Sequence, residues 1–252
     1  MRTTACLVFL ALPLLVRAGH AYPAPVAPAP VAQQDDRSVV DGLIENGRTQ
    51  LDSGQIAEAL ATFELAHERE PGPRTRAWIV RTWLAQGRIQ DALLATDELK
   101  AAGADAAMLD YLYGMGFYFN AKADVDAGTT NAVTGEQLGD AARMLKRATQ
   151  ADETRFPDAW YPLAEAAWYS QDLTLARQAV EIALATKPFV PSTLFLRGRI
   201  AMSQYVAARS APDETEGEGA AGAKAADAAE AQWRAAAESF EAGSARWEER
   251  PD

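Results

Sequence analysis

The chain has 252 residues, a formal net charge of -11 at pH 7, one cysteine and two histidines. A structural zinc site needs about four Cys or His ligands, so we expect no metal site, and no motif points to a cofactor. The acidic balance also argues against nucleic acid or anionic lipid as a partner, because both attract basic patches.

The first 21 residues have the layout of a secretory signal peptide. Arg2 gives a positive start, an apolar run extends from Ala5 to Val16, and small residues continue to Ala21. That run is shorter than the roughly 20 apolar residues that span a membrane. We therefore expect cleavage after Ala21, or after Ala18, and export to the periplasm or out of the cell. A retained anchor is the alternative.

Residues 22–37 begin with alternating proline and alanine, from Tyr22 onward. Such a stretch favours extended polyproline II structure and cannot build a helix. The pattern predicts a semi-rigid linker, and a proline-rich ligand for another protein is the alternative.

From residue 38 to residue 252, turn signals separate helical stretches, and no run alternates with the period of a strand. Two stretches are alike, because Gly54 and Ala59 recur 33 residues later as Gly87 and Ala92. The same small–large–small spacing is found again at Ala176, Val180 and Ala183. Such self-similarity indicates an array of repeated helix pairs.

These residues resemble the tetratricopeptide repeat (TPR) family, whose 34-residue motif reads W-x2-L-G-x2-Y…A-x3-F…P. The stretch from Pro157 to Pro188 matches best: Trp160 and Leu163 hold first-helix positions, although Ala167 stands where Tyr is usual. The resemblance implies an all-α fold, a right-handed α-solenoid of about five TPR-like helix pairs over residues 38–252.

Two of the five pairs are interrupted relative to the others. We expect inserted loops at about residues 122–136 and 209–223, the second rich in Gly, Pro, Asp and Glu and therefore disordered. Residues 124–128 faintly suggest a calcium loop, but the EF-hand spacing fails because Gly135 stands at the twelfth position.

In TPR proteins the first helix of each pair lines a concave groove that holds a peptide or a partner's helix, and the resemblance implies the same here. It assigns to the groove Arg48, Arg74, Trp78, Arg81, Tyr111, Met115, Tyr118, Phe119, Tyr161, Glu165, Trp168, Tyr169, Phe195, Arg199 and Met202. Aromatic and arginine side chains are favoured at interface hot spots. Packing between helices is an equal alternative for Tyr118, Phe119, Trp168 and Tyr169.

TPR domains that clamp a chaperone's C-terminal carboxylate carry Lys and Asn at set first-helix positions. This chain has Ile44, Arg48, Ala77 and Arg81 there, so that ligand is not expected. Arg48, Arg74 and Arg81 suit an acidic partner, with solvated arginine side chains as the alternative.

We therefore expect a protein-interaction module or adaptor in cell-envelope assembly that binds a protein or peptide, and not an enzyme. Signal cleavage would remove Cys6, the only cysteine, and no GxSxG, P-loop or HExxH motif occurs. An all-α glycan- or cell-wall-active enzyme that uses carboxylates is the alternative, and a purely structural spacer is a third reading.

The last helical stretch carries Trp233, Phe240 and Trp247 at intervals of seven residues, which places them on one face. We expect that face to pack on residues 194–205. The other side then lacks a neighbour, and we hypothesise that it is a partner or self-association surface.

Overall fold

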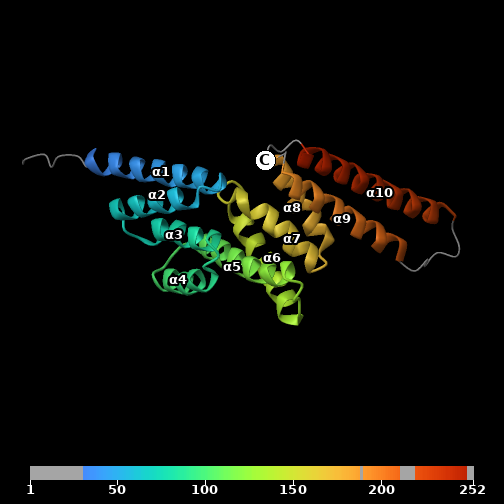
Figure 1. Ribbon diagram of the computed structural model, residues 1–252, viewed down its shortest axis with the longest axis horizontal. Helices are drawn as coiled ribbons and strands as arrows, with labels where there is room; N and C mark the ends of the chain where they lie inside the picture. Colours follow the sequence, from blue (N-terminus) through green and yellow to red (C-terminus); the bar gives the residue numbers. More distant parts are fainter. Residues whose placement is uncertain (1–30, 188–189, 211–218, 249–252) are drawn as a thin grey trace, which may run out of the picture.

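The computed structural model describes residues 31–187, 190–210 and 219–248, and Figure 1 shows their arrangement. The expected signal peptide lies outside the described residues. The helices are α1 (Val31–Asp52), α2 (Ile56–Arg69), α3 (Pro73–Ala85), α4 (Ile89–Ala101), α5 (Ala106–Asp126), α6 (Ala132–Ala151), the 3-10 helix η1 (Pro157–Ala159), α7 (Trp160–Tyr169), α8 (Leu173–Thr186), α9 (Pro191–Ser210) and α10 (Gly219–Glu248). Within these ranges no helix is both long and apolar enough to cross a membrane.

The helices pack in consecutive pairs, as the repeat predicts. The pairs are α1 with α2, α3 with α4, α5 with α6, α7 with α8, and α9 with α10. Each pair also packs on the next, through α2 and α3, α4 and α5, α6 and α7, and α8 and α9. Figure 1 shows the resulting elongated array, with the α1–α2 and α9–α10 pairs at opposite ends. The expected all-α solenoid is confirmed over the described residues.

A recurring contact explains why paired helices lie close together. Three first-helix glycines each face a large side chain of the second helix: Gly47 faces Phe63, Gly114 faces Leu145, and Gly198 faces Phe240. A β-carbon added at Gly114 would lie 2.8 Å from Cγ of Leu145, closer than two carbon atoms normally approach. The glycine therefore lets the axes approach, and the large side chain fills the remaining space.

A residue with positive φ turns the chain between the two helices of a pair. Gly54, Gly87 and Gly128 have φ angles of 77°, 77° and 69° after α1, α3 and α5. The equivalent residue after α7 is Gln171, with φ 65°, the only non-glycine residue with positive φ in the described ranges. Because a β-carbon disfavours this conformation, Gln171 is a strained helix stop.

The first expected loop insertion, residues 122–136, is mostly helical, so that expectation was wrong. Helices α5 and α6 have 21 and 20 residues, whereas α3 and α4 have 13 each. Only residues 127–131 form the turn, and Asn131 begins a capping box that starts α6. Helix is favoured in this segment because Val125 packs against the core and Thr134 is buried.

The second expected insertion, residues 209–223, falls partly on residues 211–218, which lie outside the described ranges. On either side of that gap the expectation of a loop was wrong, because α9 continues to Ser210 and α10 begins at Gly219.

The expected linker, residues 22–37, is also shorter than predicted. Helix α1 begins at Val31, so the last part of that stretch is helical. The physical reason is that no proline follows Pro30 in this stretch, and the backbone N–H groups needed for a helix are therefore present.

Candidate partner-binding face

The first helices of successive pairs form a continuous row. Helix α1 touches α3, α3 touches α5, α5 touches α7, and α7 touches α9. The residues expected to line a groove therefore come from neighbouring helices, and we call this series of five helices the first-helix row.

Burial divides the expected groove residues into three groups. The buried ones are Trp78, Arg81, Tyr111, Met115, Tyr118 and Glu165. The half-buried ones are Arg48, Arg74, Phe119, Tyr161, Trp168, Tyr169, Phe195 and Met202. Only Arg199 is exposed. The buried side chains cannot contact a partner in this structure, so their assignment to a groove surface is corrected, and the accessible aromatic residues lie mainly on α7.

A buried ion pair links the N-terminal half of the row to the start of α7. Arg81 Nη2 donates to Asp158 Oδ2 at 2.8 Å, and Arg81 Nε donates to the Tyr111 hydroxyl at 2.6 Å. The Tyr111 hydroxyl in turn donates to Asp158 Oδ2 at 2.6 Å. The third guanidinium nitrogen, Arg81 Nη1, is buried and has no hydrogen-bond partner in the described part of the chain. The three side chains thus join α3, α5 and η1 through one carboxylate oxygen.

In this cluster the Asp158 carboxyl is held ionised and the Tyr111 phenol is held protonated. Burial by itself would raise the pKa of the Asp158 carboxyl, but the Arg81 charge and the hydrogen bonds from Tyr111 and Arg81 outweigh it and lower that pKa. Burial raises the pKa of the Tyr111 phenol well above its ordinary value. Tyr111 is therefore protonated at neutral pH and acts as a hydrogen-bond donor.

The segment between α6 and η1 covers the N-terminal half of the first-helix row. Its central residue, Phe156, is fully buried and stacks on Tyr111 with 4.3 Å between ring centroids. The backbone carbonyl of Arg155 accepts a hydrogen bond from Arg48 Nη2 at 3.2 Å. Together with Asp158, these contacts mean that residues 152–158 occupy the part of the row where an external peptide was expected.

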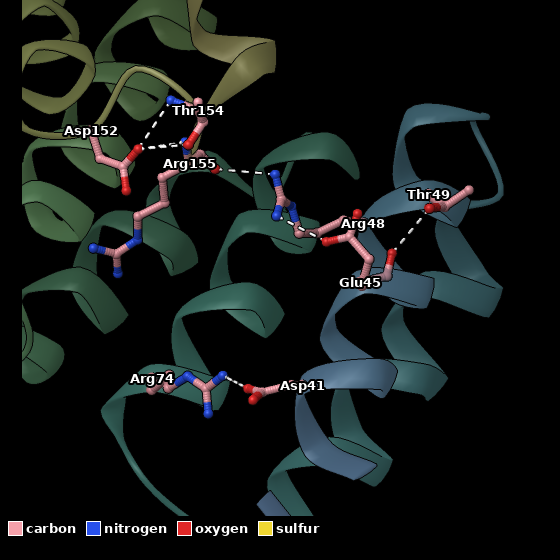
Figure 2. Close-up of polar contacts among 8 residues, drawn as sticks. All are labelled: Asp41, Glu45, Arg48, Thr49, Arg74, Asp152, Thr154 and Arg155. Atoms are coloured by element: carbon pink, nitrogen blue, oxygen red, sulfur yellow. Dashed lines mark hydrogen bonds and ion pairs between the residues drawn. The ribbon is translucent and has the colours of Figure 1, made fainter. Parts of the chain in front are cut away.

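Figure 2 shows how this segment is shaped and attached. The Asp152 carboxylate accepts hydrogen bonds from the Thr154 N–H at 3.0 Å and the Arg155 N–H at 3.1 Å, which closes a tight turn. These bonds lower the pKa of Asp152, the bond from the Thr154 hydroxyl most of all. The turn directs the Arg155 carbonyl toward Arg48, while the Arg155 side chain pairs with Asp105 at the start of α5.

Arg48 and Arg74, expected to meet an acidic partner, are both paired within the chain. Arg48 Nη1 bonds Glu45 at 3.0 Å, and Arg74 pairs with Asp41, as Figure 2 shows. Lys187, at the end of α8, also pairs with Asp52 at the end of α1, with 3.3 Å between Lys187 Nζ and Asp52 Oδ1. These half-exposed pairs are individually weak. Even so, Arg48 and Arg74 each already have a carboxylate partner within the chain.

Further along the row, α5 and α7 share a second buried polar contact. The Tyr118 hydroxyl donates to Glu165 Oε2 at 2.6 Å, and Glu165 is 3% exposed. Burial, followed by the charge of Glu165, raises the pKa of Tyr118, so this phenol keeps its proton. The same two causes raise the pKa of the half-buried Tyr161 to about 12. For Tyr118 the alternative of packing between helices therefore holds.

At the C-terminal end of the row, α7 presents an aromatic pair to α9. Trp168 and Tyr169 lie edge to face with 4.6 Å between centroids, and Trp168 Nε1 donates to the Ser203 hydroxyl at 2.9 Å. The Arg199 guanidinium lies 4.0 Å from the Trp168 ring centroid and 5.9 Å from that of Tyr169. This cluster combines half-exposed aromatic rings with an exposed cation.

Sequence reasoning missed the contribution of Asp152, Phe156 and Asp158. Their signal was present, since Asp152 followed by Thr154 is a turn pattern and Pro157 excludes a continuous helix. The local sequence does not show, however, that this turn packs over Arg81 and Tyr111. Over the described ranges, no group of three or more His, Cys, Asp or Glu side chains is placed to hold a metal ion.

The consecutive helix pairs and the contacts between first-helix glycines and large second-helix residues define a TPR-like α-solenoid. No family model and no curated protein matches the sequence. Among solved structures, the chain is similar to TTC0263, a thermophilic TPR protein of Thermus thermophilus, at 17% identity and TM-score 0.49, over 75% of this chain and 98% of that one.

Two further solved structures show weaker similarity. MamA has 14% identity and a TM-score of 0.43, over 81% of this chain and 95% of that one. YrrB, a TPR protein with an unusual peptide-binding site, has 14% identity and a TM-score of 0.37, over 83% and 96%. Likeness at this level assigns no residue and no ligand to the chain.

Proposed function

We propose that this chain is an exported protein-interaction module that binds a peptide or partner helix on the first-helix row, as an adaptor in cell-envelope assembly. The observation that carries the proposal is the cluster of Trp168, Tyr169 and Arg199 on α7 and α9. Half-exposed aromatic rings beside an exposed arginine have the composition of an interface hot spot. They are held in place by helix packing and therefore need little ordering on binding.

The buried polar groups support this placement. Buried polar groups need partners, and two of the row have them: Arg81 pairs with Asp158 of η1, and Glu165 accepts a hydrogen bond from Tyr118. These groups join α3, α5 and α7 through hydrogen bonds of fixed geometry. A rigid row is what a preorganised binding face requires.

A pull-down with residues 22–252 tests the binding proposal. The variant Trp168→Ala/Tyr169→Ala should lose partners that the unaltered protein captures. The control is Leu94→Ala, since Leu94 is 65% exposed on α4, a second helix. If the aromatic variant and the control retain the same partners equally well, the first-helix row is not the binding face.

Export is tested separately by the N-terminus of the protein recovered from a fractionated bacterial culture. We expect a mature chain that begins at Tyr22, or at Gly19, in the periplasmic fraction. A chain that begins at Met1 in the cytoplasm would contradict export without affecting the binding proposal.

The alternative of a carboxylate-using enzyme gains no support from Asp158, the carboxylate that pairs with Arg81. A general acid in glycoside hydrolysis needs a raised pKa, whereas the pKa of Asp158 is lowered by Arg81 and Tyr111. We therefore propose binding and not hydrolysis.

Self-association through α10 stays a prediction. Phe240 packs at Gly198 and Trp233 lies 5.7 Å from Tyr205, so this face of α10 contacts α9 as expected. Light scattering on the mature chain tests the rest. A dimer that dissociates on Ala242→Arg, an exposed position on the side of α10 away from Phe240, supports the prediction, and a monomer at all concentrations contradicts it.

A further inference from the structure

The first-helix row repeats one arrangement three times, an arginine placed over an aromatic ring of the neighbouring first helix. Arg48 lies 5.3 Å from the Trp78 centroid, Arg81 lies 5.9 Å from that of Tyr111, and Arg199 lies 4.0 Å from that of Trp168. Contact with a ring restricts the side chain, so a guanidinium held this way loses less freedom when it binds an acceptor.

Two of the three arginines already bind an acceptor from residues 152–158. Arg48 donates to the backbone carbonyl of Arg155, and Arg81 pairs with the carboxylate of Asp158. Between these two acceptors, the Phe156 side chain fills the space against Tyr111. The chain thus shows which ligand chemistry the row accommodates: a short segment, here a turn followed by a 3-10 helix, with an aromatic side chain and, two residues later, an acidic one.

The third arginine differs from the other two in having no such partner. Arg199 is exposed, and no carboxylate of the described residues lies within ion-pair distance of it. The nearby acid Glu165 is buried and accepts from Tyr118, and Lys122 pairs with Asp126. The C-terminal end of the row therefore presents an uncompensated positive charge, on a chain whose net charge is -11.

We propose that this end of the row binds a short segment of a partner protein through an Asp or Glu side chain, which pairs with Arg199, while an apolar side chain of the same segment packs on Trp168 and Tyr169. The proposal deepens the proposed binding function and rests on it. The acid is assigned to a side chain and not to a chain terminus, because the resident acceptor at Arg81 is the side chain of Asp158. An arginine fork matches a carboxylate with two parallel hydrogen bonds.

The chain supplies its own probe for this site. The acetylated and amidated peptide Thr-Arg-Phe-Pro-Asp, which copies residues 154–158, contains one carboxylate and one aromatic ring. We would titrate it into 15N-labelled residues 22–252 and follow the indole N–H resonance of Trp168, assigned with Trp168→Phe. The matched peptide with Asn in place of Asp keeps the shape and removes the charge.

We expect the Asp peptide to shift the Trp168 resonance and to bind about tenfold more tightly than the Asn peptide, as one charge-assisted pair allows. Arg199→Gln should remove that difference and leave the weaker binding of the Asn peptide unchanged. Arg88→Gln is the control, because Arg88 also lies over a tryptophan, 4.5 Å from the Trp83 centroid, but already pairs with Asp91.

Three results would overturn the proposal: no shift of the Trp168 resonance at millimolar peptide, equal affinity of the two peptides, or an unchanged preference for Asp in Arg199→Gln. In the last case, loss of binding in Arg48→Gln would show that the peptide displaces residues 152–158 instead. The binding function has a separate readout. A partner whose capture depends on Trp168 and Tyr169 but not on Arg199 supports that function and excludes the acidic segment.

Discussion

The guanidinium of Arg81 and the carboxylate of Asp158 are 2.8 Å apart, although 77 residues separate them in the chain. Their side chains are 8% and 22% exposed, so the pair is largely removed from water. It ties α3 to the start of α7 and holds residues 152–158 over Tyr111. Its removal should therefore affect both stability and the shape of the row.

Asp158→Asn should lower the free energy of unfolding by about 3 kcal/mol, because it leaves the buried Arg81 charge without its partner. Urea unfolding followed by circular dichroism measures the loss. Asp110→Asn is the control, since the Asp110–Arg147 pair is more exposed and should change stability by about 1 kcal/mol at most. Similar losses in the two variants would contradict this role of the buried pair.

The same pair predicts a dependence of stability on pH. The folded state lowers the pKa of Asp158 below its unfolded value, so the stabilisation is complete above the unfolded pKa and is lost as the pH falls through the folded pKa. The difference in unfolding free energy between the unaltered protein and Asp158→Asn should be constant from pH 7 to about pH 5 and shrink below about pH 4. Urea titrations across this range measure it. A difference that grows on acidification would show that the pKa is raised.

Gly114→Ala should destabilise the α5–α6 pair by about 1–3 kcal/mol, because the added β-carbon meets Leu145, including its backbone nitrogen at 3.1 Å. Gly135→Ala in α6 is the matched control, since nothing lies within 4 Å of the added carbon. There the gain in helix propensity should stabilise the protein by about 0.5–1 kcal/mol. Thermal unfolding measures both variants. If Gly135→Ala also lowered the stability, the clash with Leu145 would not explain the effect of Gly114→Ala.

Gln171→Gly should raise the free energy of unfolding by up to about 1 kcal/mol, because φ at this position is 65° and glycine adopts it without a steric penalty. Gly87→Ala makes the reverse change at the equivalent turn, where φ is 77°, and should lower stability by about 1 kcal/mol. Chemical unfolding of both variants is the measurement. If Gln171→Gly were destabilising, the Gln171 side chain would contribute more than its backbone conformation costs.

The helix pairs were predictable from the sequence because their determinants are local and repeat at a fixed spacing. Gly54 and Gly87 mark turns, and a first-helix glycine with a large second-helix residue, such as Gly47 with Phe63, marks a close crossing. Residues 122–136 were predicted as a loop because they interrupt the α5–α6 pair relative to the shorter repeats. Packing of Val125 against the core and burial of Thr134, which repeat length does not reveal, favour helix there.

The candidate face was predicted only in outline. The resemblance to TPR proteins assigned Tyr111 and Trp168 to a groove, but a sequence pattern cannot tell a side chain that faces a partner from one covered by another part of the chain. Residues 152–158 lie over Tyr111, which is fully buried, whereas Trp168 is half-exposed.

The sequence by itself determined that this chain is a series of stacked helix pairs, because turn chemistry, helix propensity and the spacing of small and large residues act over about one repeat length. Only the tertiary structure decided which arginines of the row are already paired. That outcome depends on contacts such as Arg48 with the Arg155 carbonyl, 107 residues apart, which no local pattern encodes. The same long-range packing leaves Arg199 exposed beside Trp168 and Tyr169, where we place the partner.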